Sequence, residues 1–184
     1  FQELREDGYI YVDKTKYLID MIDNGKVYFL SRPRRFGKSL TVSTFDALFS
    51  GKKELFKGLY AEEFFRRPHY KTHPVIHIDM SQVITDSTAD ALRLSLFQQV
   101  ADNLDRHEVS LPAYIGTEAS MAFKEVIKLA SKKHGKVVIL IDEYDKPILD
   151  CLDDTAKAEE VRKILRGFYS QIKAEDANTK FVFM

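Results

Sequence analysis

The run Val137–Ile141 is apolar throughout and is followed directly by Asp142 and Glu143. A strand with one face in water alternates apolar and polar residues, whereas an unbroken apolar run is typical of a strand that is buried on both faces. Such a strand needs helices on both sides of its sheet, which is the arrangement found in parallel α/β proteins. The run therefore predicts an α/β domain with a mostly parallel sheet.

Segments with helical and with strand-like patterns alternate along the rest of the chain, as expected for right-handed connections between parallel strands. Asn24-Gly25, Gly51 and Gly135 mark ends of helices. We expect helices at about 14–23, 40–49, 87–107, 118–133 and 155–174, short helices and loops at 52–70, and strands at 27–30, 74–80, 137–141 and from about 180.

Charge and cysteine content exclude several classes of protein. The chain has 28 Lys and Arg residues against 28 Asp and Glu residues, so a grossly basic nucleic-acid coat protein or an acidic tail is excluded. The single cysteine, Cys151, excludes an internal disulfide framework and fits a reducing compartment. No apolar run approaches the roughly 20 residues that span a bilayer. We therefore expect a cytoplasmic protein with no membrane partner.

The length of 184 residues suits one domain of ordinary size. The chain begins at Phe1 rather than at a methionine, and it ends at Met184 inside an apolar run that has the pattern of a strand. We therefore expect residues 1–184 to form one domain that is incomplete at its C-terminus and belongs to a longer protein.

The sequence Gly37-Lys38-Ser39 lies between a short apolar run and a helix, which is the setting of a phosphate-binding loop, or Walker A motif. Backbone N–H groups at the helix start can cradle phosphates, the lysine can reach the β- and γ-phosphates, and the hydroxyl can ligate Mg²⁺. The pattern requires an earlier glycine where this chain has Arg32. The alternative is therefore a chance Gly-Lys-Ser at the start of a helix.

The acidic pair Asp142-Glu143 at the end of the buried strand is typical of a Walker B element. There Asp142 can hold Mg²⁺ through water, and Glu143 can deprotonate the attacking water. Acidic residues also commonly leave a buried strand at its solvent end, which is the alternative. The order and joint occurrence of the two motifs favour nucleotide binding.

Several other residues near these motifs keep open interpretations. Arg32, Arg34 and Arg35 can contact phosphate, but they can also form a solvated basic loop or pair with the acidic segment after Ile141. Phe36 is expected in the core rather than in a platform that stacks a base.

The segments Ser31–Leu40 and Ile139–Ile148, together with the opening Phe1–Thr15, resemble the bacterial AAA-ATPase-like domain family. The resemblance covers essentially the whole chain, and in that family an arginine at the first position of the phosphate loop is usual. It implies a three-layer αβα P-loop NTPase core of the additional-strand type, with the loop after the first strand and the acidic pair on the third.

The resemblance also implies features beyond this chain. Family members commonly continue into a C-terminal domain similar to PD-(D/E)XK nucleases. A polar sensor residue and a later arginine are expected after Met184, so weak or absent turnover is expected of residues 1–184 alone.

We expect an ATPase domain of a bacterial protein with ATP and Mg²⁺ as ligands. Lys38 and Glu143 are the expected catalytic residues, and Ser39 and Asp142 are expected to hold the metal. The expected phosphate cradle comprises Arg34, Arg35, Phe36, Gly37, Lys38, Ser39 and Leu40.

The alternative is a module that binds nucleotide with little turnover and controls an attached nuclease-like domain or another partner. The base preference and homo-oligomerisation stay open. Direct nucleic-acid binding rests only on the local arginines.

Overall fold

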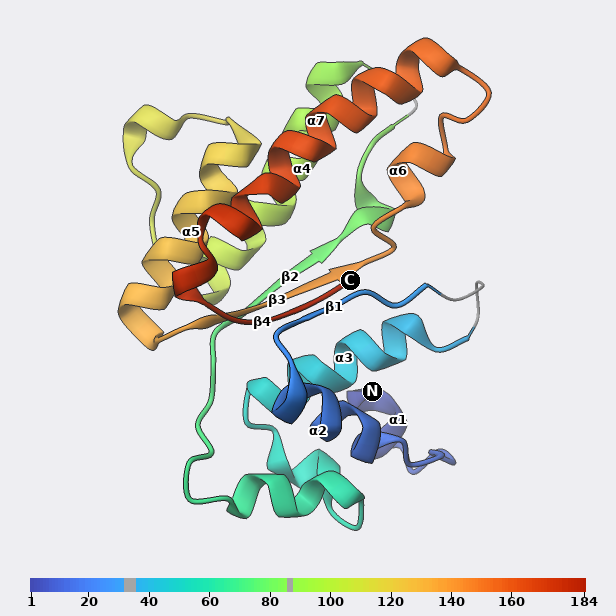
Figure 1. Ribbon diagram of the computed structural model, residues 1–184, viewed down its shortest axis with the longest axis vertical. Helices are drawn as coiled ribbons and strands as arrows, with labels where there is room; N and C mark the ends of the chain where they lie inside the picture. Colours follow the sequence, from blue (N-terminus) through green and yellow to red (C-terminus); the bar gives the residue numbers. More distant parts are fainter. Residues whose placement is uncertain (32–35, 86–87) are drawn as a thin grey trace.

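A four-stranded, all-parallel sheet crosses the middle of the protein (Figure 1). The computed structural model describes residues 1–31, 36–85 and 88–184. The strand order is β1-β4-β3-β2, so the last strand of the chain lies between the first and the third. This order confirms the expected parallel sheet of the additional-strand type. The strands are β1 (Val27–Tyr28), β2 (Val75–Asp79), β3 (Val137–Asp142) and β4 (Thr179–Phe183).

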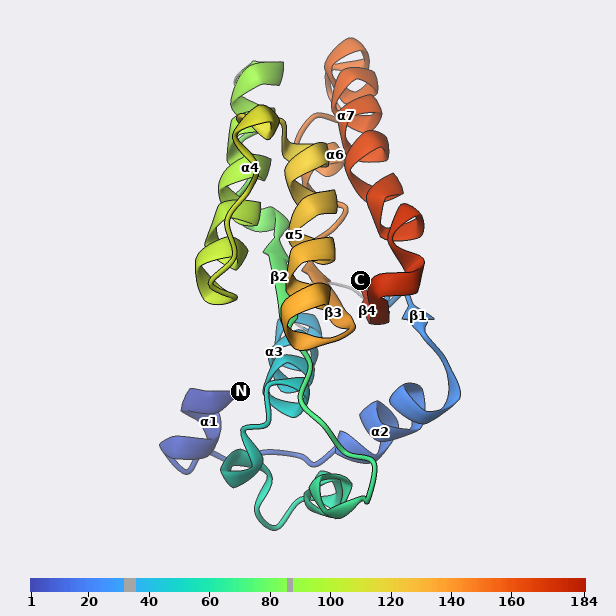
Figure 2. The same ribbon diagram turned by 90° about the vertical axis from the view of Figure 1, so that its left-hand side faces the viewer.

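Helices cover both faces of the sheet, as the two perpendicular views in Figures 1 and 2 show. The first face carries α1 (Gln2–Glu6), α2 (Thr15–Asn24) and α3 (Lys38–Phe49), with the 3₁₀ turns η1 (Lys53–Phe56) and η2 (Tyr60–Arg66). The second face carries α4 (Ala89–Arg106), α5 (Ala119–His134) and α7 (Thr155–Ala174). The remaining short elements are α6 (Lys146–Leu149), η3 (Met80–Gln82), η4 (Ala113–Ile115) and η5 (Asp176–Asn178).

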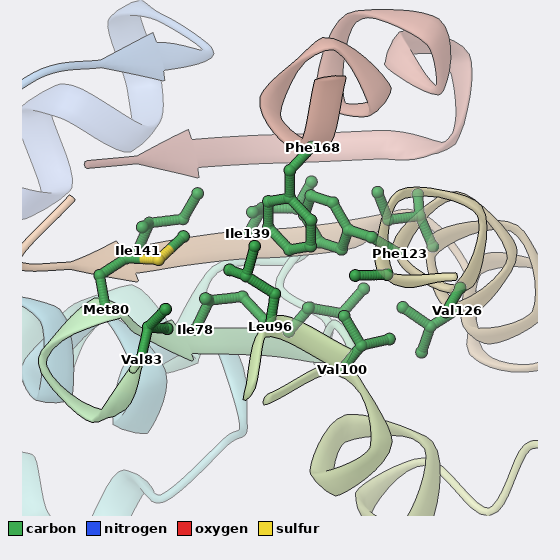
Figure 3. Packing of buried hydrophobic residues seen from close by; sticks show 14 of the residues in the cluster. Ile78, Met80, Val83, Leu96, Val100, Phe123, Val126, Ile139, Ile141 and Phe168 are labelled. Atoms are coloured by element: carbon green, nitrogen blue, oxygen red, sulfur yellow. The ribbon is translucent and has the colours of Figure 1, made fainter. Parts of the chain in front are cut away.

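The two faces of β3 supply the two hydrophobic cores, and all six of its residues are buried. Ile139 and Ile141 point into the core under α4, α5 and α7 (Figure 3), whereas Val138 and Leu140 belong to the core under α2 and α3. Successive side chains of a strand point to opposite faces, so a strand covered on both sides must be apolar at every position. The unbroken apolar run therefore predicted this layer correctly.

The expected element boundaries are close to the observed ones, and the differences have local causes. α3 begins at Lys38 rather than Leu40, because Gly37 supplies the backbone turn that starts it. β1 is shorter than the expected 27–30 as a regular strand, yet the Leu30 N–H still donates to the Met184 carbonyl at 2.7 Å. Within the described ranges, no helix is both long and apolar enough to cross a bilayer.

Phe123→Ala tests the core of the second face. Phe123 of α5 stacks on Phe168 of α7 with ring centroids 4.4 Å apart and planes 7° apart, and both side chains are fully buried (Figure 3). Removing a buried phenyl ring leaves a cavity, so the substitution should lower the free energy of unfolding by about 3 to 5 kcal/mol in denaturant titrations. Phe36→Ala is the matched control, because Phe36 is 63% exposed. This control should change stability by less than about 0.5 kcal/mol. Similar losses for both variants would contradict this packing.

Candidate functional site

The residues expected to form the site meet at the carboxyl ends of β1, β4 and β3. The Met184 N–H donates to the Tyr28 carbonyl, and the Leu30 N–H donates to the Met184 carbonyl, so the chain stays against β4 until Leu30. It then leaves the sheet at Ser31 and enters α3 at Lys38. In open α/β sheets, ligands bind in the crevice outside the carboxyl ends of the strands. The two sequence motifs therefore lie where a ligand site is expected.

The start of α3 presents backbone donors. Gly37 precedes the helix with a φ of 78°, a left-handed conformation that glycine adopts without steric cost. The first intrahelical bond runs from the Thr41 N–H to the Gly37 carbonyl at 2.9 Å. The N–H groups of Lys38, Ser39 and Leu40 precede that bond and have no acceptor among the described residues. Three donors and the positive end of the helix dipole thus favour an anion here.

The structure brings the lysine of one motif to the carboxylate of the other. Lys38 Nζ lies 3.8 Å from Glu143 Oε2, with the two side chains 14% and 28% exposed. Glu143 has a φ of 49°, which is unusual for a residue with a side chain. Its N–H donates to Asp142 Oδ1 at 2.9 Å, and its carbonyl accepts from the Lys146 N–H. This turn after β3 directs Glu143 toward the start of α3.

Asp142 is a buried carboxylate at the same strand end, with 8% of its surface exposed. Among the described residues, its Oδ1 accepts only the Glu143 N–H, and its Oδ2 has no partner. The neighbouring Asp79 is in register with it, but Ser81 and Gln82 donate to that carboxylate. Burial alone would raise the pKa of Asp79, and these hydrogen bonds outweigh burial and lower it. Of the two carboxylates, Asp142 is therefore the one with an oxygen, Oδ2, that no described residue occupies and that a ligand can reach.

An aromatic contact joins the two loops above β4. Phe29 follows β1 and Tyr144 follows β3, and their ring centroids lie 4.5 Å apart. The Tyr169 hydroxyl of α7 donates to the Tyr144 carbonyl at 3.1 Å. Burial raises the pKa of Tyr169, so its hydroxyl keeps its proton and remains a donor near neutral pH. This contact was not predicted from the sequence, although an aromatic residue just after each motif-bearing strand was a usable signal.

A cavity of about 280 Å³ opens beside Gly37, between the N-terminal segment and α3. The expectation that Phe36 lies in the core was wrong, because Phe36 sits at the cavity wall with 63% of its surface exposed. Ile10 and Val12 are also largely exposed. The sequence could not distinguish these apolar residues from core residues. The cavity is lined by Leu4, Ile10, Tyr11, Val12, Lys14, Leu18, Phe36, Gly37, Leu40, Thr41 and Thr44.

The other expected site residues divide into two groups. Ser39 is exposed in the first turn of α3, and Leu40 follows it. Arg34 and Arg35, together with Arg32, lie outside the described residues. Within the described ranges, no three His, Cys, Asp or Glu side chains cluster as metal ligands would.

Comparisons with known proteins find one relative and one family. An uncharacterized protein in the vnfD 5′ region of Azotobacter chroococcum mcd 1 is 41% identical over 187 residues, covering 100% of this chain and 35% of the relative. The chain thus spans about a third of the length of that relative. No solved structure matches.

A family model described as a predicted AAA-ATPase matches residues 1–184. Its match includes the Gly-Lys-Ser turn, the acidic pair and the inserted fourth strand. Because the match runs over the full length given, the chain belongs to the AAA-ATPase-like family.

Proposed function

We propose that the chain binds Mg·ATP and hydrolyses it as the ATPase domain of a larger bacterial protein. The observation that carries the proposal is the ion pair between Lys38 and Glu143 beside the free N–H groups of α3. A cation, three backbone donors and a carboxylate in one crevice are the groups that phosphoryl transfer to water requires.

The phosphates are held by the start of α3. The N–H groups of Lys38, Ser39 and Leu40 donate to phosphate oxygens, and Lys38 adds a point charge at the β- and γ-phosphates. The Lys38 side chain is 14% exposed, so water screens this charge less than at an open surface. Arg34 and Arg35 belong to the same proposed cradle.

Magnesium fits the residues at the crevice, because it prefers oxygen ligands and is commonly held by few protein groups together with phosphates. The Ser39 hydroxyl and the unpartnered Asp142 oxygen are the proposed donors, the second acting through water. When bound, the ion neutralises charge on the β- and γ-phosphates. A site of this kind needs no cluster of three protein carboxylates or imidazoles.

Glu143 is the proposed general base. Arrival of a phosphate group draws Lys38 away from Glu143 and leaves the carboxylate free to accept a proton. The water oxygen then attacks the γ-phosphorus, the bond to the bridging β–γ oxygen breaks, and the water proton passes to Glu143. ADP leaves with the electrons of the broken bond, and Lys38 stabilises the charge that develops there.

The base and ribose are proposed to occupy the cavity beside Gly37. Its volume of about 280 Å³ lies just below the range common for complete ligand sites, as suits a subsite for part of a ligand. Phe36 and Tyr11 offer aromatic surface, and Thr41 lies at the helix turn that follows the phosphate donors.

The second candidate function is a nucleotide-gated module with little or no turnover. The Phe29–Tyr144 contact and the Tyr169 hydrogen bond favour it, because they connect the two loops to α7. In this case nucleotide binding would control an attached nuclease-like domain or another partner. Single-turnover hydrolysis by the full-length protein separates the two functions, since the module would show none above background.

Asp142→Asn tests the metal site. Calorimetric titration with ATP should show Mg²⁺-dependent affinity in the wild type, and removal of the negative charge should weaken it by roughly tenfold. Asp79→Asn is the matched control at the neighbouring strand end, where Ser81 and Gln82 already occupy the carboxylate. An Asp142→Asn variant with full Mg²⁺ dependence would remove Asp142 from the metal site.

A further inference from the structure

A cavity of about 790 Å³ lies at the amino-terminal end of the sheet, opposite the crevice described above. Its wall is built from the ends of α2 and α3, the segment after η2, and the residues at the start of β3 and β4. The volume falls within the range of sites that enclose small organic molecules. Neither sequence motif contributes to it.

Three lysines from separate parts of the chain converge on this cavity. Lys71, Lys136 and Lys180 line it, and none of them forms an ion pair with another described residue. The cavity also contains Arg67, which pairs with Asp23 at 2.7 Å. The lining thus has a surplus of positive charge although the chain as a whole is neutral.

A backbone irregularity directs one of these lysines. Val137 pairs with Thr179 and Val138 pairs with Phe181, so Lys180 is the additional residue of a β-bulge. Lys180 is the exposed residue of β4, and the other four are buried. Bulges re-aim side chains and are frequent beside functional sites. Lys136 follows the C-terminus of α5, where the negative end of the helix dipole favours a cation. The helix dipole does not explain the positions of Lys71 and Lys180.

His73 also lines the cavity, near these positive charges. Burial lowers its pKa, the hydrogen bond to the Lys136 carbonyl partly opposes this, and the charges of Lys71 and Lys180 lower the pKa further. Its Nδ1 lies 2.7 Å from the Lys136 carbonyl, so the neutral ring donates through Nδ1 and keeps Nε2 as an acceptor. The cavity therefore offers lysine cations and a neutral acceptor.

Aromatic residues form the apolar part of the wall. Phe49 is almost fully buried, and Phe64 and Tyr70 are half-buried. Arg67 lies over the Phe64 ring at 5.0 Å from its centroid, which holds that guanidinium at the wall. A flat apolar group can pack against such a surface while its charged group faces the lysines.

We propose that this cavity binds a small organic anion, with a phosphate or carboxylate held by Lys71, Lys136 and Lys180 and an apolar portion against the aromatic wall. A nucleoside monophosphate has this chemistry. The site is independent of Lys38 and of ATP turnover.

The probe is 8-anilinonaphthalene-1-sulfonate, an aromatic anion whose fluorescence rises in apolar sites. The triple variant K71Q/K136Q/K180Q should bind it about tenfold more weakly than the wild type. The control variant K16Q/K53Q/K173Q removes the same charge from exposed lysines elsewhere and should bind it as the wild type does. Lys38→Ala should also leave the titration unchanged. Circular dichroism and thermal melting check that each variant is folded.

Competition identifies the class of ligand. Thymidine 5′-monophosphate should displace the probe, whereas thymidine should not, because it has no phosphate. Equal binding by the two triple variants would overturn the proposal, since the cavity lysines would then hold no anion. Displacement by a twelve-residue thymidine oligonucleotide but not by the monophosphate would also overturn it, in favour of a nucleic-acid surface.

Discussion

Glu143→Gln in the full-length protein is expected to slow single-turnover ATP hydrolysis by roughly 10² to 10⁴, which is the usual cost of removing a general base. Glutamine keeps the size and polarity of the side chain but cannot accept the water proton. ATP affinity should equal that of the wild type or become tighter, because the substitution also removes the partner that competes with phosphate for Lys38. The measurements are rapid-mixing hydrolysis and calorimetric titration of the same preparations.

Asp145→Asn is the control for that experiment, because it neutralises an acidic residue in the same loop that has no proposed role. It should hydrolyse ATP at the wild-type rate. If Glu143→Gln does the same, Glu143 is not the base. If the full-length wild type itself shows no hydrolysis above background, the nucleotide-gated module replaces the enzyme as the better proposal.

Lys38→Ala is expected to abolish phosphate-dependent binding, with ATP affinity falling by roughly ten- to a hundredfold toward that of adenosine. The variant loses the cation at the phosphates and also leaves Glu143 as an unpaired negative charge beside them. The double variant K38A/E143Q should therefore recover part of the affinity. Lys16→Ala, at an exposed position of α2, should bind ATP as the wild type does. Unchanged ATP affinity in a folded Lys38→Ala variant would exclude Lys38 from the phosphate site.

The layers of the fold could be predicted because they depend on local patterns. An apolar residue at every position of β3 before Asp142 requires cover on both faces, and α7 has its apolar residues at helical spacing over the predicted range 155–174. The register could not be predicted in the same way. The bulge at Lys180 arises from pairing between β3 and β4, and no short window of sequence contains both strands.

The proximity of the two motifs was predictable from their residue types and their places at a helix start and a strand end. A lysine at a helix start and a carboxylate at a strand end were expected to meet, and the structure brings Lys38 to Glu143. The exposure of Phe36 was not predictable, because an aromatic residue favours burial unless the surrounding chain leaves it at a surface. The lysine-lined cavity also escaped prediction, since its three lysines come from distant segments.

The position of β4 has a consequence for the order in which the protein folds. Within the described sheet, β1 pairs only with β4, and Lys26 just before β1 contacts Asp176 just before β4, 150 residues further along the chain. On a ribosome that adds about 5 to 20 residues per second, β1 therefore waits for many seconds without a partner strand. The crevice takes shape only when β4 inserts between β1 and β3. A nucleotide that binds only the finished crevice would stabilise this insertion, and so would favour chains in which β4 is in place over chains in which it is not.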